Sequence, residues 1–242
     1  MDLKVDLHIH TVASGHAFST LNEIIHKAVE KEMTLIGISD HGPSMDGASC
    51  ESSFNMKDDI HREGLANNIK VLFGCEANIL SHKGDIDISQ DTLMNLDYDL
   101  AGLHEFTPYP GGDAVYNTKA ILSCMEKNNI FAVSHPITVD YETDVKAIAE
   151  AAGGLQIALE LNDRVFHRKN PRIINEYLKL IDHCKSYNTK MILSSDSHVL
   201  STAGCFENIE IIKDSIMECP ELILNNNVDK IYEMIEKMHE KR

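Results

Sequence analysis

Lys4-Val5-Asp6-Leu7-His8-Ile9-His10 is a short apolar run that ends in two histidines, and this arrangement recurs along the chain. Short apolar runs bounded by turn residues are typical of the buried strands of a parallel sheet. The sequence predicts seven such strands, near residues 3–9, 34–39, 70–76, 98–103, 131–134, 155–161 and 191–195.

Helical patterns separate most of these runs. Apolar residues repeat at helical spacing over 21–29 after Ser19 or Thr20, over 148–152 before Gly153-Gly154, over 173–184, and from Val228 to Lys241 after Asn227. Strand–helix alternation predicts a parallel sheet with right-handed crossovers. Because seven strands are one short of a (β/α)8 barrel, we predict an α/β fold, a distorted (β/α)7 barrel, in one domain spanning residues 1–242. An open doubly wound sheet is the alternative.

The composition is that of a globular enzyme, with 43% hydrophobic and 25% charged residues. The net charge of −16 makes the backbone of a nucleic acid an unfavourable partner. No stretch approaches the ~20 apolar residues of a membrane span. The six cysteines form no C-x-x-C pair, which predicts reduced thiols in a cytoplasmic protein.

Side chains of the kind that bind metals stand at the ends of the apolar runs. His8 and His10 are two residues apart on a predicted strand and should point to one face, as should Asp196 and His198. Functional side chains of closed α/β barrels gather at the carboxyl ends of the strands, so the whole set should meet at one mouth. The set is His8, His10, His16, His41, Glu76, His104, His135, Asp196 and His198.

Imidazole and carboxylate ligands suit zinc, and also manganese or iron. One zinc ion takes about three or four protein ligands, so the set is too large for a single ion. Two or three divalent ions could use it fully if they shared a bridging carboxylate, and Glu76 stands alone at a central strand end. The remaining histidines, which we interpret as structural, are His26, His61, His82, His167, His183 and His239.

These motifs resemble those of the PHP (polymerase and histidinol phosphatase) family. The resemblance is carried by His8-Ile9-His10-Thr11, Ala13-Ser14-Gly15-His16-Ala17-Phe18-Ser19, Ser39-Asp40-His41-Gly42 and Ser195-Asp196-Ser197-His198. It covers residues 1 to about 215, and it is greatest to the short stand-alone phosphatases of the YcdX-like group. It implies a distorted (β/α)7 barrel with a trinuclear metal site, usually of zinc.

Carried over by position, the resemblance assigns His8, His10, Glu76 and Asp196 to a first metal, Glu76, His104 and His135 to a second, and His16, His41 and His198 to a third. Glu76, Asp196 and His198 are the candidates for a direct catalytic role. The chain departs from the family pattern at Gly15, where threonine is frequent, and in the segment 162–169.

The chemistry implied by the resemblance is hydrolysis of small-molecule phosphate monoesters by a metal-bound hydroxide. Metal binding lowers the pKa of water from about 15.7 toward about 7, which supplies hydroxide at neutral pH. A phosphodiesterase or nuclease on the same site is one alternative, which the acidic charge and the lack of a basic groove with interleaved aromatics disfavour. A non-catalytic metal-binding domain is the other, although degenerate family members typically lose ligands that this chain keeps.

Four further residues are candidates for supporting roles. Arg164 and Arg168 belong to a basic cluster in an acidic chain and are candidates for contacts with substrate phosphate; the alternative is a solvated loop. Asp6 could orient a ligand histidine or lie buried in the barrel floor. Asp40 could lie behind the ligands or donate a proton.

Overall fold

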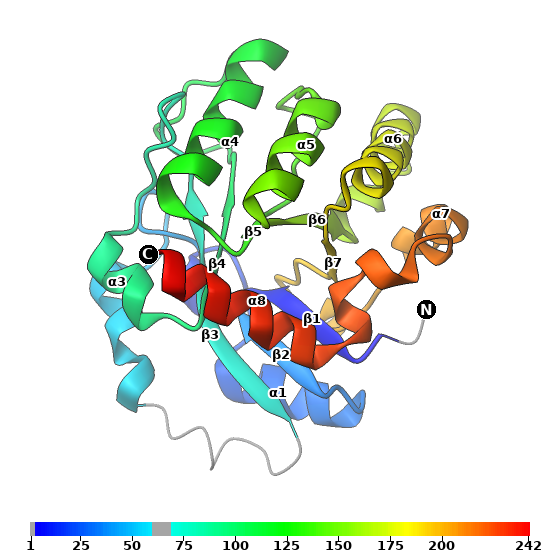
Figure 1. Ribbon diagram of the computed structural model, residues 1–242. Coiled ribbons are helices and arrows are strands. Elements are labelled where there is room, and N and C mark those ends of the chain that lie inside the picture. Colours follow the sequence, from blue (N-terminus) through cyan, green and yellow to red (C-terminus); the bar gives the residue numbers. More distant parts are fainter. Residues whose placement is uncertain (1–2, 60–68) are drawn as a thin grey trace.

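The computed structural model describes residues 3–59 and 69–242, in which seven parallel strands form a nearly closed barrel surrounded by helices (Figure 1). The strands are β1 Val5–Ile9, β2 Leu35–Ile38, β3 Lys70–Asn78, β4 Tyr98–Gly102, β5 Ala132–Val133, β6 Ala158–Asn162 and β7 Met191–Ser194. Each strand pairs with the next one along the chain. This order confirms the predicted barrel, because a doubly wound sheet would reverse its strand order near the middle.

The helices lie in the connections between the strands, and side-chain caps mark where several of them begin. They are α1 Leu21–Glu30, α3 Gln90–Asn95, α4 Ala114–Asn128, α5 Val145–Leu155, α6 Pro171–Tyr187, α7 Lys213–Met217 and α8 Val228–Lys241. Thr20 caps α1 in a reciprocal capping box with Glu23, and Asn227 caps α8, as predicted. Among the 3-10 turns, η1 Val12–Ser14, η2 Glu51–Asp59, η3 Arg164–Phe166 and η7 Leu224–Asn226 matter below.

The predicted stop of α5 at Gly153-Gly154 is wrong. Both glycines lie inside the helix, which ends at Gln156 in the left-handed conformation with φ 62°. A Cβ on Gly153 would lie 2.7 Å from the backbone oxygen of Tyr187. Gly153 therefore permits α5 to pack closely against the end of α6, and it is not a helix terminator. Strand β6 accordingly begins at Ala158, later than predicted.

Strand β3 is longer than predicted, and this moves Glu76 from a strand end to a strand interior. The segment after β2 continues alongside β3, since Glu76 donates its backbone N–H to the oxygen of Asp40 and accepts from Gly42, both at 2.9 Å. The backbone around Glu76 is thus held on the β2 side beyond the last residue of β2.

The barrel closes between β1 and β7 through a mixture of backbone and side-chain contacts. His10 N donates to Ser197 O at 2.9 Å, next to an isolated bridge between Ile9 and Ser197. Near the start of β1, the Asn225 side chain from η7 lies between β1 and β7. Its Nδ2 donates to Val5 O at 3.0 Å and to Leu193 O at 2.8 Å. An amide side chain thus takes the place of a backbone ladder at the seam.

The barrel interior is apolar at one end and is covered there by α8. Ile231, Ile235 and Met238 of α8 pack on the buried cluster that contains Val5 and Leu35 from the starts of β1 and β2. In Figure 1, α8 (red) lies across the barrel in front of β1–β4. The functional residues must therefore lie at the other end.

Tyr98 fills the middle of the barrel and donates a 2.7 Å hydrogen bond to Leu7 O. A Cβ on Gly37 would lie 2.2 Å from the Tyr98 hydroxyl oxygen, and one on Gly74 would lie 2.6 Å from the Tyr98 ring. These two glycines make room for the ring.

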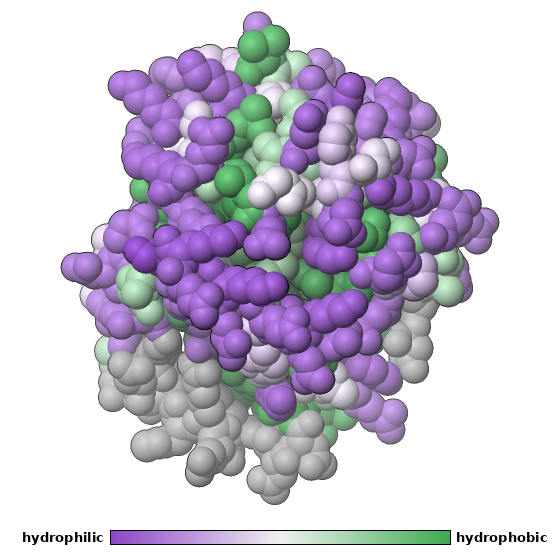
Figure 2. Space-filling model, viewed as in Figure 1, coloured by the Kyte–Doolittle hydropathy of each residue, from purple (hydrophilic) through white to green (hydrophobic). Residues whose placement is uncertain are grey.

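A second, larger apolar layer lies between the strands and the surrounding helices. On the face shown in Figure 2, hydrophilic side chains cover most of the surface, and hydrophobic ones show mainly in the gaps between them. No helix in the described part of the chain combines the length and apolarity that crossing a membrane requires.

Candidate metal centre

All nine predicted ligands come together at the carboxyl end of the barrel, although they come from segments scattered along the chain. Glu76 is at the centre and has no exposed surface. Its Oε1 lies 2.8 Å from His135 Nε2 and 3.0 Å from His104 Nε2. Its Oε2 lies 3.0 Å from His41 Nδ1 and 3.2 Å from His8 Nε2. His10 Nε2 is also 3.4 Å from Oε2, so the two oxygens of one carboxylate face different groups of imidazoles.

Asp196 and His198 lie on the β1 side of Glu76. Asp196 Oδ1 is 3.3 Å from His10 Nε2 and 3.7 Å from His8 Nε2. His198 Nε2 is 2.9 Å from His16 Nε2, and this pair lies at the exposed rim. The rings of His16 and His41 stack with centroids 5.0 Å apart, which joins the rim to the buried part.

Hydrogen bonds behind the H-x-H pair decide where its nitrogen lone pairs point. His8 Nδ1 lies 2.6 Å from Oε1 of Glu160, an acceptor, so His8 Nδ1 carries a proton. Ser14 Oγ donates to Asp40 Oδ1 at 2.6 Å, and it therefore accepts from His10 Nδ1 at 2.9 Å. The neutral form of each ring then has its bare lone pair on Nε2.

The two Nε2 atoms of this pair lie 2.9 Å apart. Two lone pairs at that separation repel each other unless a proton or a metal ion lies beside them. In addition, Glu76 Oε2 and His41 Nδ1 are buried without a hydrogen bond from any described residue. Buried polar atoms normally have partners. The residues present therefore fit a group of cations.

Three sets of ligand atoms are compact enough to hold one ion each: His10, His41 and His198; His8, His10 and Glu76; and His41, Glu76 and His104. The sets overlap at His10, His41 and Glu76, so they do not reproduce the three separate ligand groups implied by the family resemblance. The assignment of ligands to particular ions stays a prediction.

The electrostatics of the cluster follow from charge packed into a buried space. Burial, the largest influence, favours neutral His8, but the carboxylates of Glu76, Glu160 and Asp196 outweigh it and hold the His8 pKa well above its ordinary value. Burial and the repulsion of His41 and His198 hold the pKa of His10 well below its ordinary value.

Glu76 and Asp196 remain charged for the same reason. Burial alone would raise the pKa of Glu76, but the surrounding histidines, led by His8, outweigh it and hold this pKa well below the ordinary range. His8 and His10 act similarly on the pKa of Asp196. The site therefore offers two anionic ligands among neutral and cationic imidazoles.

Two candidate ligands have a backbone conformation that L-residues rarely adopt. His135 has φ 26° and Asp196 has φ 50°. Such residues cost of order 1–3 kcal/mol each and persist where the surrounding structure enforces them. Both lie two residues after the end of a short strand, β5 or β7, where the chain turns at the barrel mouth.

Asp40 and Asp6 have distinct surroundings. Asp40 accepts hydrogen bonds from Ser14 Oγ and from Thr11 N and Oγ1, the latter two at 2.7 Å, so it lies behind His10. Asp6 accepts from the backbone N–H groups of His8, Ser195 and Gly204 at 3.1–3.3 Å. Its carboxylate thus meets backbone N–H groups, and among the described residues no hydrogen bond joins it to an imidazole.

The two candidate phosphate-binding arginines differ in position. Arg164 opens η3, and its Nη1 hydrogen-bonds His198 Nδ1 and lies 3.7 Å from Asp196 Oδ1. About half of the Arg164 side chain is exposed, at 52%. Arg168 is exposed, and no contact joins it to a candidate ligand within the described ranges. Arg164 thus lies beside the candidate ligands at the rim, and the phosphate-binding role of Arg164 and Arg168 stays a prediction.

The histidines interpreted as structural lie elsewhere. His82 Nδ1 contacts Tyr116 OH at 3.0 Å, and His239 Nε2 contacts Asp97 O at 3.1 Å. His26 and His167 are exposed and His183 is half-buried. His61 lies outside the described residues. The five described histidines belong to none of the three compact ligand sets.

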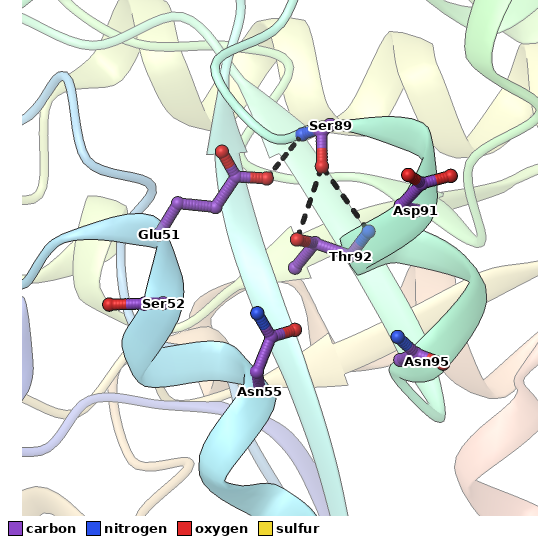
Figure 3. Close-up of a pocket in the computed structure, with 7 residues that line it drawn as sticks. All are labelled: Glu51, Ser52, Asn55, Ser89, Asp91, Thr92 and Asn95. Atoms are coloured by element: carbon purple, nitrogen blue, oxygen red, sulfur yellow. Dashed lines mark hydrogen bonds between the residues drawn. The ribbon is translucent and has the colours of Figure 1, made fainter.

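A hollow of about 450 Å³ between η2 and α3 is separate from the metal centre (Figure 3). Its walls are polar but contain none of the nine ligands: Glu51, Ser52, Asn55, Ser89, Asp91, Thr92 and Asn95. The backbone N–H of Ser89 donates to Glu51 Oε1 at 2.7 Å. The Ser89 hydroxyl caps α3 by accepting from the backbone N–H of Thr92. Glu51, Ser89 and Thr92 thus hold the start of α3 in place.

Sequence reasoning missed Glu160, Ser14 and Asn162. Glu160 contacts His8, and Asn162 Nδ2 bridges Glu160 Oε2 at 3.1 Å and Asp196 Oδ2 at 3.2 Å. A signal for Glu160 existed: it is a charged residue in the middle of an apolar strand pattern, where burial is costly unless a partner is present. Ser14 carried no comparable signal.

Comparisons with known proteins agree with this geometry. The PHP domain profile matches residues 6–241. A probable phosphatase of Clostridium acetobutylicum is 34% identical over 235 residues, which cover 97% of this chain and 95% of the relative. Probable phosphatase YcdX of Escherichia coli K12 is 37% identical over 235 residues, covering 96% and 94%.

A solved structure shows the same fold. Histidinol phosphate phosphatase of Lactococcus lactis, crystallised with zinc, L-histidinol and phosphate, matches with a TM-score of 0.66. The match covers 89% of this chain and 93% of the other at 17% identity.

Proposed function

The chain belongs to the PHP family, and from this premise we propose that it is a metal-dependent phosphatase that hydrolyses small-molecule phosphate monoesters at a trinuclear centre. The phosphatase activity is supported by relatives named as probable phosphatases along almost the whole chain. The observation that carries the trinuclear proposal is that eight other metal-type side chains gather around one buried carboxylate, Glu76.

The residues that would hold the ions are grouped as the family resemblance implies. His8, His10 and Asp196 would hold one ion, His104 and His135 a second, and His16, His41 and His198 a third, with Glu76 shared by the first two. His41 also lies 3.0 Å from Glu76 Oε2. Zinc suits this nitrogen-rich ligand set, which can also bind manganese or iron. When bound, such ions lower the pKa of coordinated water and neutralise charge on a phosphoryl group, which together make hydrolysis feasible near neutral pH.

The protein's own residues would orient the ligands and bind the ester. Glu160 and Ser14 fix the two H-x-H rings with Nε2 directed inward. Arg164 would bind a phosphate oxygen at the rim, because a guanidinium forms strong charge-assisted hydrogen bonds with phosphate. Glu76, Asp196 and His198 would have the direct catalytic role, because they would hold the ions that supply the chemistry.

The proposed substrate is a small phosphate ester and not a nucleic acid. The net charge of −16 would repel an extended phosphate backbone, whereas a single phosphate needs only the local charge of the ions and Arg164. The L. lactis structure contains L-histidinol and phosphate, the alcohol and the phosphate that a small phosphate ester would yield on hydrolysis, on the same fold. We propose no particular leaving group. A single domain over residues 1–242 and a cytoplasmic location stay predictions.

The test combines elemental analysis with hydrolysis of p-nitrophenyl phosphate and bis(p-nitrophenyl) phosphate by the purified full chain. We expect about three metal ions per chain and monoesterase activity that a chelator removes and zinc or manganese restores. Activity on the diester alone would favour the nuclease alternative. Less than one tightly bound ion per chain, with no activity after metal addition, would refute the catalytic proposal.

A further inference from the structure

Glu160 lies in the middle of β6, has no exposed surface and stands outside the predicted ligand set. A buried carboxylate is costly unless donors satisfy it, and Glu160 has four. Its Oε1 accepts from His8 Nδ1 at 2.6 Å and from the Ser194 hydroxyl. Its Oε2 accepts from the backbone N–H of His135 at 2.6 Å and from Asn162 Nδ2 at 3.1 Å. Two of these donors belong to candidate metal ligands.

The contact with His8 determines which nitrogen of the ring is available. Because Oε1 of the carboxylate accepts the Nδ1 proton, Nε2 is left to face His10 and Glu76. Carboxylates in this place behind a ligand histidine fix its tautomer and raise its basicity. The His8 ring itself is completely buried, so no water can substitute for Glu160 from solvent.

The contact with His135 acts on the backbone. His135 has φ 26°, a conformation that persists only when neighbouring groups enforce it. The 2.6 Å hydrogen bond from His135 N to Glu160 Oε2 holds the peptide at the point where the chain turns. This orientation brings His135 Nε2 to 2.8 Å from Glu76.

A third connection runs through Asn162, two residues further along β6. Its side-chain amide contacts both Glu160 Oε2 and Asp196 Oδ2. Asp196 also has a positive φ, of 50°. One buried carboxylate is therefore linked to His8, His135 and Asp196, which come from three different strand ends.

We propose that Glu160 is a positioning residue for metal binding, which holds His8 and His135 at a fixed separation on the two sides of Glu76. The inference rests on the metal centre of the proposed function but not on hydrolysis. Its effect is the pre-orientation of two ligands that lie 127 residues apart in the sequence. Glu160 and Glu76 each contact both His8 and His135.

Glu160→Gln is the first variant, because an amide has one acceptor oxygen and one donor nitrogen. Whichever way the amide turns, it cannot accept from both His8 Nδ1 and His135 N. Asp99→Asn is the matched control. Asp99 is equally buried and contacts a backbone N–H and the Arg242 guanidinium, but it lies at the α8 end of the barrel.

Zinc affinity of each purified full-length protein is measured by competition with a chromophoric chelator. We expect Glu160→Gln to weaken zinc binding roughly 10- to 100-fold, as is typical for partners of ligand histidines, and Asp99→Asn to keep the parent affinity. The visible spectrum of the cobalt-loaded protein should change in Glu160→Gln and not in Asp99→Asn, because it reports ligand geometry and not fold stability.

Glu160→Asp keeps the test decisive if Glu160→Gln does not fold by circular dichroism. Its charge is retained, but a side chain shorter by one methylene cannot reach both partners, so we expect weaker zinc binding again. Parent affinity and an unchanged cobalt spectrum in a folded Glu160 variant would overturn the proposal. So would failure of both variants to fold beside a folded Asp99→Asn, which would make Glu160 a structural residue of the barrel.

The outcome is separable from that of the proposed function. A parent protein that binds zinc but hydrolyses no phosphate ester would refute the phosphatase proposal and leave the role of Glu160 testable by affinity and spectrum. A parent protein that binds neither zinc nor cobalt would refute both.

Discussion

Ser14 Oγ donates a 2.6 Å hydrogen bond to Asp40 Oδ1, which ties η1 to the segment that follows β2. The same oxygen accepts from His10 Nδ1 at 2.9 Å and from the backbone N–H of His41 at 3.2 Å. A hydroxyl that donates once and accepts twice has used its full capacity. Asp40 therefore acts on the candidate ligand His10 through Ser14 and does not touch it directly.

Ser14→Ala should weaken metal binding without unfolding the protein. The variant removes the acceptor that keeps a proton on His10 Nδ1, so Nε2 loses its fixed orientation. We expect zinc affinity to fall by roughly tenfold or more, measured by chelator competition. Ser186→Ala is the control, since the Ser186 hydroxyl contacts only Asp182 O on the exposed side of α6. Equal affinities in the two variants would contradict the role given to Ser14.

His10→Ala should reduce monoesterase activity to the background rate. His10 belongs to two of the three compact ligand sets, so its loss should affect more than one ion. The metal content of the purified variant, determined by elemental analysis, should fall together with activity. His26→Ala on the exposed side of α1 should leave metal content and activity at the parent values. An active His10→Ala protein would exclude these ligand sets as the catalytic centre.

Arg164→Ala should impair phosphate binding, whereas Arg168→Ala should not. Arg164 lies against His198 and Asp196, whereas Arg168 is exposed and has no hydrogen bond or ion pair with either in the described structure. A hydrogen bond to a charged group contributes about 1.5–3 kcal/mol, so kcat/KM for p-nitrophenyl phosphate should fall by roughly 10- to 100-fold. Inhibition by inorganic phosphate should weaken in parallel. If Arg168→Ala has the larger effect, the loop after β6 binds substrate differently from this proposal.

The barrel and the converging ligands could be predicted from the sequence because both depend on local patterns. Buried parallel strands leave short apolar runs, and a strand end that faces the mouth leaves a polar residue at the end of each run. His104 and His135 were found in this way, each from the run before it. Their meeting at Glu76 follows once the strands form one barrel.

The remaining features depend on contacts between distant segments. Glu76 looks like a strand end in sequence, but residues 40–42 extend the pairing and place it inside β3. Gly153 looks like a helix stop, but it serves the close approach of α5 to Tyr187. Glu160 stands out in the sequence as a charged residue in an apolar run, but its partner His8 is distant in sequence, so no local pattern indicates which residue it contacts.

The buried pair of Asp99 and Arg242 gives a prediction about stability at the other end of the barrel. The Arg242 side chain is 2% exposed and Asp99 is fully buried. Burial, the largest influence, raises the Asp99 pKa, and the Arg242 charge lowers it without cancelling the rise. Removing one partner of a buried pair typically costs roughly 3–5 kcal/mol, so Arg242→Met should destabilise the metal-free protein clearly at pH 8.

The loss of folding stability caused by Arg242→Met should be smaller at pH 5 than at pH 8. Because the folded-state pKa of Asp99 is raised, folding favours its protonated form, and stability falls as pH rises from the ordinary carboxyl pKa through the raised one. Without Arg242 this pKa rises further, so more of Asp99 is neutral at pH 5 and less charge is buried unpaired. Urea denaturation of Arg242→Met and of the parent at both pH values measures the difference in their unfolding free energies. The titration of distant histidines is the same in both proteins and cancels in this difference. The double variant Arg242→Met with Asp99→Asn should lose this pH dependence. If Arg242→Met alone destabilises the protein equally at both pH values, the titration of Asp99 is not its cause.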